Sequence, residues 1–158
     1  MILYHGSNVL FNKVDLSLSK NKRDFGKGFY TTVLKKQAKD WAQILNFRHN
    51  GNGVFVYRFE LNLEGLTVKN FDTLSIEWLD FVKENRIKGG IRHSFDVVQG
   101  PVANDKTMET VSNYFDGTYS AKEALSRLAY MKTNNQVSIH TEKALSNLIF
   151  IRREKWTV

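Results

Sequence analysis

Apolar and polar positions alternate most regularly in residues 53–63, GVFVYRFELNL. Bulky apolar side chains occupy every second position from Phe55 to Leu61, and Arg58 and Glu60 lie between them. A period of two is typical of a strand that buries one face. This stretch is the clearest predicted strand of the chain.

A different period governs residues 35–47. Ala38, Trp41, Ala42 and Leu45 recur there at steps of three and four, which predicts an amphipathic helix. The stretch HNGNG that follows contains residues that end helices. Trp41 fits the apolar stripe, so core packing is the ordinary explanation of its position.

The same two patterns predict the remaining elements. Further strands are expected at residues 1–5, 29–31, 95–101, 136–141 and 148–156, and further helices at residues 73–86, 120–132 and 141–148. Ser120 and Glu123 form the sequence signature of a capping box at the start of one helix. The mixture predicts an α+β fold, with strands both early and late in the chain.

Composition limits the size and class of the molecule. The chain has 158 residues, of which 42% are hydrophobic and 13% aromatic, enough for one core. Neither a linker nor a repeat is visible, so we expect a single domain, residues 1–158. No apolar run is long enough to span a bilayer, and the start of the chain does not resemble a targeting segment. We therefore expect a soluble cytoplasmic protein without membrane contact.

Cysteine content and charge narrow the chemistry. The absence of cysteine excludes disulfides, thiolate metal sites and a cysteine nucleophile. The formal charge of +7 favours acidic partners, such as phosphate-bearing small molecules, nucleic acid or an acidic protein. The basic residues lack interleaved aromatic residues at exposed positions, so nucleic-acid binding is the most distant interpretation.

Two glycine-containing stretches carry the candidate chemistry. In YHGS, His5 offers an imidazole beside Gly6, whose backbone a planar ligand can approach. In DFGKGFYTT, residues 24–32, two glycines flank Lys27 and precede Tyr30, which suits the wall of a pocket. A satisfied histidine at a strand end and a hairpin turn with a surface lysine are the alternatives. An aromatic residue, Trp41, follows Tyr30 by eleven positions.

In this order, YHGS, FGKGFYTT and the later aromatic residue resemble the ADP-ribosyltransferase superfamily, in its poly-ADP-ribose-polymerase and diphtheria-toxin branch. The chain is also similar to a bacterial family that carries DFGKGFYTT, DVVQGPVANDK and NQVSIHT, some of whose members lie beside small antitoxin-like proteins. The resemblance covers most of the chain. It implies an ADP-ribosyltransferase-like fold, with central split antiparallel sheets flanked by helices.

The resemblance also implies NAD as co-substrate and a role for each matching residue. His5 would hold a hydroxyl of the adenosine ribose, and the Gly6 backbone would pair with the nicotinamide carboxamide. Tyr30 and Trp41 would sandwich the nicotinamide ring. The other residues expected to bind NAD are Ser7, Gly28 and Thr31.

The third catalytic position departs from the family pattern. Where the family has a glutamate near the start of a late strand, this chain has Gln136. A glutamine accepts a hydrogen bond from a ribose hydroxyl, but it brings no negative charge to the transition state. We therefore do not expect elongation of an ADP-ribose chain. Glu142 could substitute only if its turn folds back, and a charge in the first turn of a helix explains it more simply.

Several other polar residues have structural and functional interpretations. Asp96 and Asp105 either line the pocket or belong to a turn and a helix cap. Basic residues before the glycine stretch either steer NAD or are solvated loop charges; these are Lys20, Lys22, Arg23 and Lys27. The histidines His49, His93 and His140 have no metal-ligand spacing, so no metal site is expected.

The leading hypothesis is an NAD-dependent mono-ADP-ribosyltransferase in a toxin–antitoxin or phage-conflict system. It would transfer ADP-ribose to a macromolecular acceptor, either protein or nucleic acid, and an antitoxin protein would be a partner. The alternatives are an NAD glycohydrolase, with water as acceptor, and a catalytically silent domain that binds NAD or a partner. His5, Tyr30 and Gln136 are the expected catalytic residues.

Overall fold

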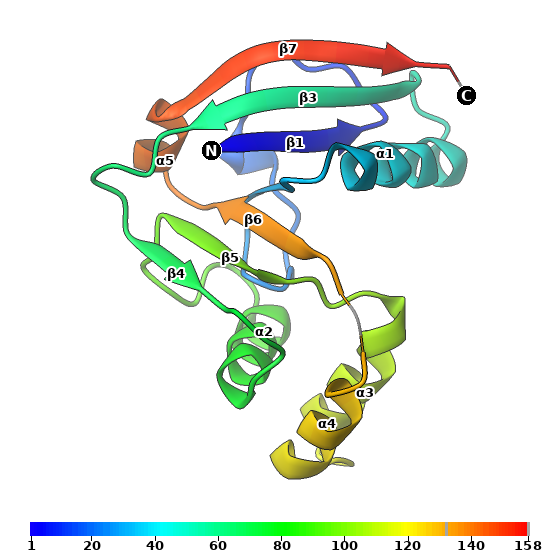
Figure 1. Ribbon diagram of the computed structural model, residues 1–158, viewed down its shortest axis with the longest axis vertical. Helices are drawn as coiled ribbons and strands as arrows, with labels where there is room; N and C mark the ends of the chain where they lie inside the picture. The colour runs from blue at the N-terminus through cyan, green and yellow to red at the C-terminus, as the bar shows by residue number, and fades with distance from the viewer. Residues whose placement is uncertain (132, 158) are drawn as a thin grey trace.

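Two β-sheets that meet along one edge form the centre of the molecule (Figure 1). The computed structural model describes residues 1–131 and 133–157. Its strands are β1 (Ile2–Ser7), β2 (Phe29–Thr31), β3 (Val54–Leu61), β4 (Val68–Asn70), β5 (Val97–Pro101), β6 (Asn135–Ile139) and β7 (Leu148–Trp156). Its helices are η1 (Leu16–Leu18), α1 (Lys35–His49), α2 (Ile76–Lys88), α3 (Asp105–Phe115), α4 (Ala121–Leu128) and α5 (Glu142–Ser146).

The predicted α+β class is confirmed, and so are most of the predicted elements. The first strand continues two residues beyond His5, and α4 ends at Leu128, earlier than predicted. Lys132, the last residue of that predicted helix, lies outside the described residues. Three elements were not predicted, namely η1, β4 and α3. The first two are three residues long, too short to show a period.

The sheets have the orders β1-β3-β7 and β2-β6-β5-β4. The expectation of purely antiparallel sheets is wrong in one place, because β4 pairs with β5 in parallel. A bridge joins the two sheets: Tyr4 and Thr32 exchange two backbone hydrogen bonds of 2.7 and 2.9 Å. Within residues 1–131 and 133–157, the sheets are continuous only at this point.

Helix α1 covers one face of the three-stranded sheet (Figure 1). Its buried side chains, Ala38 and Ala42, are small, so the helix backbone comes close to Gly6 of β1. A Cβ atom at Gly6 would lie 1.8 Å from the carbonyl oxygen of Ala38. The same face of β3 presents Val54 and Val56, both buried, so β3 is buried on both faces over its first half.

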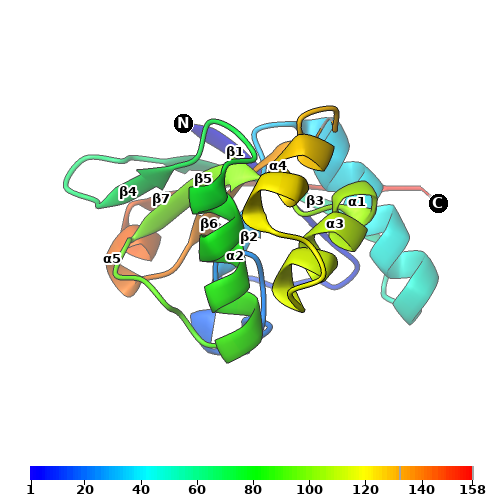
Figure 2. The ribbon, with the colours of Figure 1, turned by 90° about the horizontal axis from the view of Figure 1, so that it is seen from below.

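Helices α2, α3 and α4 lie on one side of the four-stranded sheet (Figures 1 and 2). The largest cluster of buried side chains joins these helices to the sheet and includes Phe25, Trp78 and Val98. Trp78 is fully buried, and its indole N–H donates to the carbonyl oxygen of Pro101 at 3.0 Å. A second cluster, with Leu3, lies between the two sheets. The loop that contains Phe25 is thereby fixed in the core.

The contact at Gly6 gives a prediction about stability. In Gly6→Ala the new methyl group meets helix backbone that cannot move aside, so we expect the free energy of unfolding to fall by about 3 kcal/mol or more. Gly117→Ala is the control, because its Cβ would meet nothing within 4 Å and only its φ of 84° is unfavourable. That change costs about 1 kcal/mol. Urea unfolding measures both, and equal losses would contradict the close approach of α1.

Candidate functional site

The split between β1 and β2 is the first component of the site. Beyond the bridge at Tyr4 and Thr32, the two strands exchange no further backbone bonds. Backbone groups two residues apart on a strand point to the same side. The N–H and C=O groups of Gly6 therefore point away from β3 and toward β2, as those of Tyr4 do. They form the kind of donor–acceptor pair that binds a carboxamide.

His5 closes one end of this split. Its Nδ1 lies 2.7 Å from the carbonyl oxygen of Tyr30, so Nδ1 carries the proton and donates it. The ring packs against Phe29, Phe11 and Tyr57 at centroid distances of 4.4, 5.8 and 6.4 Å. Burial lowers the pKa of His5 to about 4, although the bond to Tyr30 raises it. At neutral pH, Nε2 is therefore an unprotonated acceptor.

Tyr30 and Gln136 share one face of the four-stranded sheet. Tyr30 of β2 is paired with Ser138 of β6, and Gln136 is two residues from Ser138 along the same strand. Such diagonal neighbours lie about 7–8 Å apart, within reach of one small ligand. The structure thus brings together two of the predicted catalytic residues, which are more than a hundred positions apart in the chain.

The hydroxyl group of Tyr30 is bound to the glycine loop. It donates to the carbonyl oxygen of Gly26 at 2.7 Å and accepts from the backbone N–H of Phe25 at 2.9 Å. Burial raises the pKa of the Tyr30 phenol, so the group is neutral. The hydroxyl holds the ring in place, and only the aromatic surface can serve a ligand.

Gln136 is held by a carboxylate that the sequence analysis did not single out. Its Nε2 donates to Oδ2 of Asp24 at 2.9 Å. Oδ2 also accepts from the backbone N–H of Ala103, and Oδ1 forms an ion pair with Arg86. A carboxylate only accepts, so the amide of Gln136 must turn its nitrogen toward Asp24. Its Oε1 faces away and forms no hydrogen bond with the described residues.

The glycine stretch is packed more tightly than an open bend. The backbone N–H of Lys27 donates to Gly90, and the carbonyl oxygen of Lys27 accepts from Nδ1 of His140 at 2.7 Å. A Cβ atom at Gly28 would lie 2.7 Å from that same nitrogen. Gly26 has a φ of 89° and is buried. Gly28 was expected to contact NAD. In the structure, position 28 needs a glycine because a side chain there would collide with His140.

Trp41 lies on α1, but outside the core. Its side chain is 41% exposed, so the apolar stripe predicted for this helix is wrong at this position. Because Ala38 and Ala42 hold the helix backbone against β1, no space remains beneath it for an indole. Among the described residues, the Trp41 ring contacts no other aromatic ring, including that of Tyr30. The rings of Tyr30 and Trp41 are therefore not packed against each other in the core.

Two of the other residues expected to bind NAD have partners within the protein. Ser7 is buried, and its hydroxyl donates to the carbonyl oxygen of Val9 and accepts from the N–H of Val9. The hydroxyl of Thr31 donates to the carbonyl oxygen of Val137 at 2.7 Å, which joins β2 to β6. Both hydroxyls stabilise strands that border the split.

The remaining polar candidates have structural positions. Asp96 accepts from Thr141 and Thr67, which lowers its pKa. Asp105 is the first residue of α3, and Glu142 is the first residue of α5, as a first-turn charge should be. Lys20 and Lys22, in the basic stretch, are exposed, whereas Arg23 and Lys27 are partly buried. Over residues 1–131 and 133–157, no cluster of His, Asp or Glu suited to a metal ion is present.

Comparison with known proteins assigns the chain to a family. Residues 1–150 match the model of a family described as "Protein of unknown function (DUF3990)". The chain belongs to this family. No curated protein matches it. Within the described part of this family member, no helix is both long and apolar enough to cross a membrane.

Asp24 is the main component that sequence reasoning missed. It is the first residue of the glycine stretch, which was the available signal, but its ion-pair partner Arg86 follows 62 residues later. His140 was considered only as a metal ligand. Its role depends on contacts with Lys27 and Ser138, which lie on different segments.

The buried histidines predict how stability depends on pH. Burial lowers the pKa of His140 to about 4, and the pKa of His5 likewise. Between about pH 6.5 and pH 4 the unfolded chain therefore binds protons that the folded protein does not, so the free energy of unfolding falls as the pH falls. His140 contributes on the order of 3 kcal/mol of this loss.

Urea unfolding at pH 7 and at about pH 4.5 measures the effect. We expect His140→Gln, which keeps a donor for the carbonyl oxygen of Lys27, to reduce the difference between the two pH values. His49→Gln, at an exposed histidine of α1, is the matched control and should keep the wild-type difference. An unchanged difference in His140→Gln would contradict the neutral, buried imidazole.

The contact between Asp24 and Gln136 gives a prediction of coupling. Gln136→Glu places a second carboxylate at hydrogen-bond distance from Asp24, and the repulsion should lower the free energy of unfolding by about 1–3 kcal/mol at pH 7. Adding Asp24→Asn supplies a donor to the new glutamate. A double-mutant cycle should give a favourable coupling of about 1 kcal/mol or more.

Gln99→Glu is the control for that cycle. Gln99 of β5 is also partly buried, and its side chain forms no hydrogen bond with a described carboxylate. Its substitution should couple to Asp24→Asn by less than about 0.5 kcal/mol. If the Gln136 and Gln99 cycles gave the same result, Asp24 would not orient Gln136.

Proposed function

We propose that the protein is an NAD-dependent mono-ADP-ribosyltransferase with an ADP-ribosyltransferase-like fold. It cleaves the bond between nicotinamide and ribose and transfers ADP-ribose to a macromolecule, as an effector in a toxin–antitoxin or phage-conflict system. The observation that carries the proposal is the convergence of Tyr30 and Gln136 on one sheet face, beside the split that His5 borders. These residues resemble the superfamily's histidine, tyrosine and third polar position in their order along the chain.

The chain offers binding groups for three parts of the dinucleotide, the carboxamide, the pyridinium ring and a ribose hydroxyl. The N–H and C=O groups of Gly6 suit the carboxamide, and the ring of Tyr30 offers an aromatic surface to the pyridinium. Trp41 would cover the opposite face of that ring. Nε2 of His5, an acceptor at neutral pH, suits a ribose hydroxyl.

Gln136 is the residue that would act closest to the bond that breaks. Because Asp24 fixes its amide nitrogen, Oε1 is presented as an acceptor for a hydroxyl of the nicotinamide ribose. The partial negative charge on Oε1 would stabilise the positive charge that develops on the sugar. An amide does this more weakly than a carboxylate, which favours slow single transfer over chain elongation.

The transfer is balanced without a further cofactor. The electron pair of the C1′–N bond leaves with neutral nicotinamide. An oxygen or nitrogen of the acceptor forms the new bond to C1′ and releases one proton. The protein contributes orientation and a fixed polar environment to this step.

Trp41 provides the sharpest test, because its side chain is partly exposed and outside the core. We expect Trp41→Ala to lower the rate of nicotinamide release from NAD by about tenfold, since one wall of the stacking site is lost. Phe47→Ala is the matched control, because Phe47 lies on the same helix, is 89% exposed and should leave the rate within about twofold. NAD labelled in its adenylate group, incubated with a cell lysate, provides the readout.

The products separate the proposal from its alternatives. Label in a macromolecule supports a transferase, whereas free ADP-ribose without labelled macromolecule selects a glycohydrolase. Binding of NAD in calorimetry without turnover selects a silent NAD-binding domain. Absence of both binding and turnover in the wild-type protein overturns the assignment of the site to NAD.

A further inference from the structure

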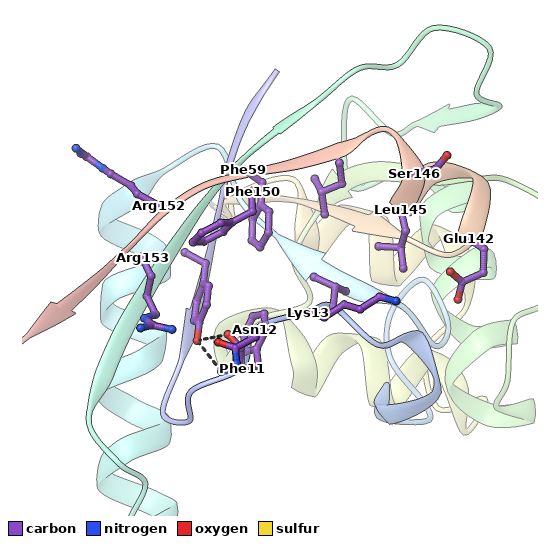
Figure 3. A pocket seen from close by; sticks show the side chains of 13 residues that line it. Phe11, Asn12, Lys13, Phe59, Glu142, Leu145, Ser146, Phe150, Arg152 and Arg153 are labelled. Carbon is purple, nitrogen blue, oxygen red and sulfur yellow. Dashed lines mark hydrogen bonds between the residues drawn. The ribbon is translucent and has the colours of Figure 1, made fainter.

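A groove lies on the opposite side of the three-stranded sheet from α1, bounded by β7, α5 and residues 11–14. We call it the β7 groove. It encloses about 730 Å³, and its lining includes Phe11, Lys13, Leu145, Phe150 and Arg153 (Figure 3). Tyr30, Trp41 and Gln136 are not part of it, so the groove is separate from the candidate site.

The floor of the β7 groove is apolar and rigid. Phe11 stacks on Tyr57 with centroids 4.0 Å apart, and Tyr57 in turn lies beside Phe59. The hydroxyl of Tyr57 accepts from the backbone N–H of Phe11 at 2.8 Å, which ties the loop to the sheet. Phe150 stands at the edge of this floor, 5.9 Å from Phe59, with 55% of its surface exposed. A bulky side chain of a partner can pack there without rearrangement.

The strand that borders the groove has exposed apolar side chains on both of its faces. Phe150 is opposite Phe59 and faces the groove, whereas Ile149 is opposite Glu60 and faces away from it. Ile149 and Ile151, 60% and 41% exposed, do not line the groove. β7 is also the outermost strand in the order β1-β3-β7. Among the described residues, no other strand pairs with its free edge.

Charge identifies the partner that suits this surface. Two cationic side chains, Lys13 and Arg153, and one anionic side chain, Glu142, border the groove, and all three are exposed, so the rim is basic. Arg152 is opposite Arg58 in the sheet, so its side chain lies on the face that α1 covers. Arg152 binds Glu154 at 2.8 Å, and the guanidinium of Arg153 lies 6.0 Å from the centre of the Tyr57 ring. A rim of this sign attracts acidic segments and steers their association.

We propose that the β7 groove binds an acidic segment of a partner protein, which places one large apolar side chain against Phe150 and Phe11. Nucleic acid fits less well, because single strands need several exposed rings for stacking. Here Tyr57 and Phe59 are only 1% and 3% exposed, so Phe150 is the main platform. The proposal does not depend on turnover of NAD.

The groove adjoins the candidate site through two shared rings. Phe11 and Tyr57 line the groove on one side and contact the imidazole of His5 on the other. A segment bound in the groove therefore packs against the residues that enclose His5. Because none of the rim residues contacts His5, substitutions at the rim test docking without altering the candidate site.

Selection from a random peptide library displayed on phage tests the proposal with the full-length protein. Peptides should be enriched on the wild-type protein and depleted on the Lys13→Glu/Arg153→Glu variant. We expect them to be acidic and to contain an aromatic or large aliphatic residue. The tightest peptide, made synthetically and labelled, should lose about tenfold in affinity with that double variant and about fivefold with Phe150→Ser. Its affinity should also fall between about 50 and 300 mM salt.

Matched controls use exposed residues away from the groove. Lys122→Glu on α4 and Phe47→Ser on α1 repeat the same types of change and should leave peptide affinity within about twofold. Three results would overturn the proposal. These are enrichment of no acidic peptides, equal losses in the control variants, and tighter binding of a labelled single-stranded oligonucleotide than of the selected peptide. Concentration-dependent dimerisation that Phe150→Ser abolishes would assign the surface to a second copy of the chain instead.

Discussion

The buried carboxylate of Asp24 binds three segments of the chain at once. A charge removed from water must be paired and hydrogen-bonded, or it destabilises the fold by several kcal/mol. Three separate parts of the chain meet this requirement: Arg86 of α2, the backbone N–H of Ala103 after β5, and Gln136 at the start of β6. The helix, the loop and the strand are thus fixed relative to one another. Since the glycine loop begins at Asp24, the position of that loop follows from the same pairing.

The glycine loop then positions Tyr30. His140 and His93 each donate to a carbonyl oxygen of the loop, those of Lys27 and Phe25, at 2.7 Å. Burial keeps both imidazoles neutral by lowering each pKa, and the second nitrogen of each ring accepts a hydrogen bond from within the protein. The hydroxyl of Tyr30 completes this network from the strand side. A ring held in this way is ordered before any ligand arrives, which is what a stacking site requires.

The sequence allowed prediction of the elements with a clear period and of the residues within them. The alternation from Phe55 to Leu61 identified β3, and the capping signal at Ser120 identified the start of α4, where the Ser120 hydroxyl accepts from the N–H of Glu123. The burial of both faces of β3 could not be predicted, because it results from the approach of α1. The prediction that Trp41 lies in the core was wrong for the same reason. The period indicated the side of α1 on which Trp41 lies, whereas the small side chains beside it determine how closely α1 approaches the sheet.

The candidate site could be predicted only in part, because the residues of the motif also have packing roles. The stretch FGKGFY carries the resemblance to the ADP-ribosyltransferase superfamily, but here its glycines are required by packing: a side chain at Gly28 would meet His140, and Gly26 needs a positive φ. Packing alone can therefore require this motif, whether or not a protein that carries it has the enzymatic activity. The proposed chemistry would depend on position 136, which is a glutamine. Local sequence could not reveal that Asp24 lies behind it, because the two residues are 112 positions apart.

The pair of Asp24 and Gln136 does not simply replace a catalytic glutamate. Two unit charges about 4 Å apart interact by roughly 4 kcal/mol at an effective dielectric constant of 20, so a carboxylate beside the sugar would stabilise it substantially. Asp24 is one hydrogen bond further away, and the guanidinium of Arg86, at 2.5 Å, cancels much of its field. What this pair would offer to a ribose is the dipole of a neutral amide whose direction is fixed. Such a group would orient a ribose hydroxyl well and stabilise positive charge only modestly, as the proposed slow, single transfer requires. The surrounding structure maintains the orientation of Gln136, which carries no charge of its own.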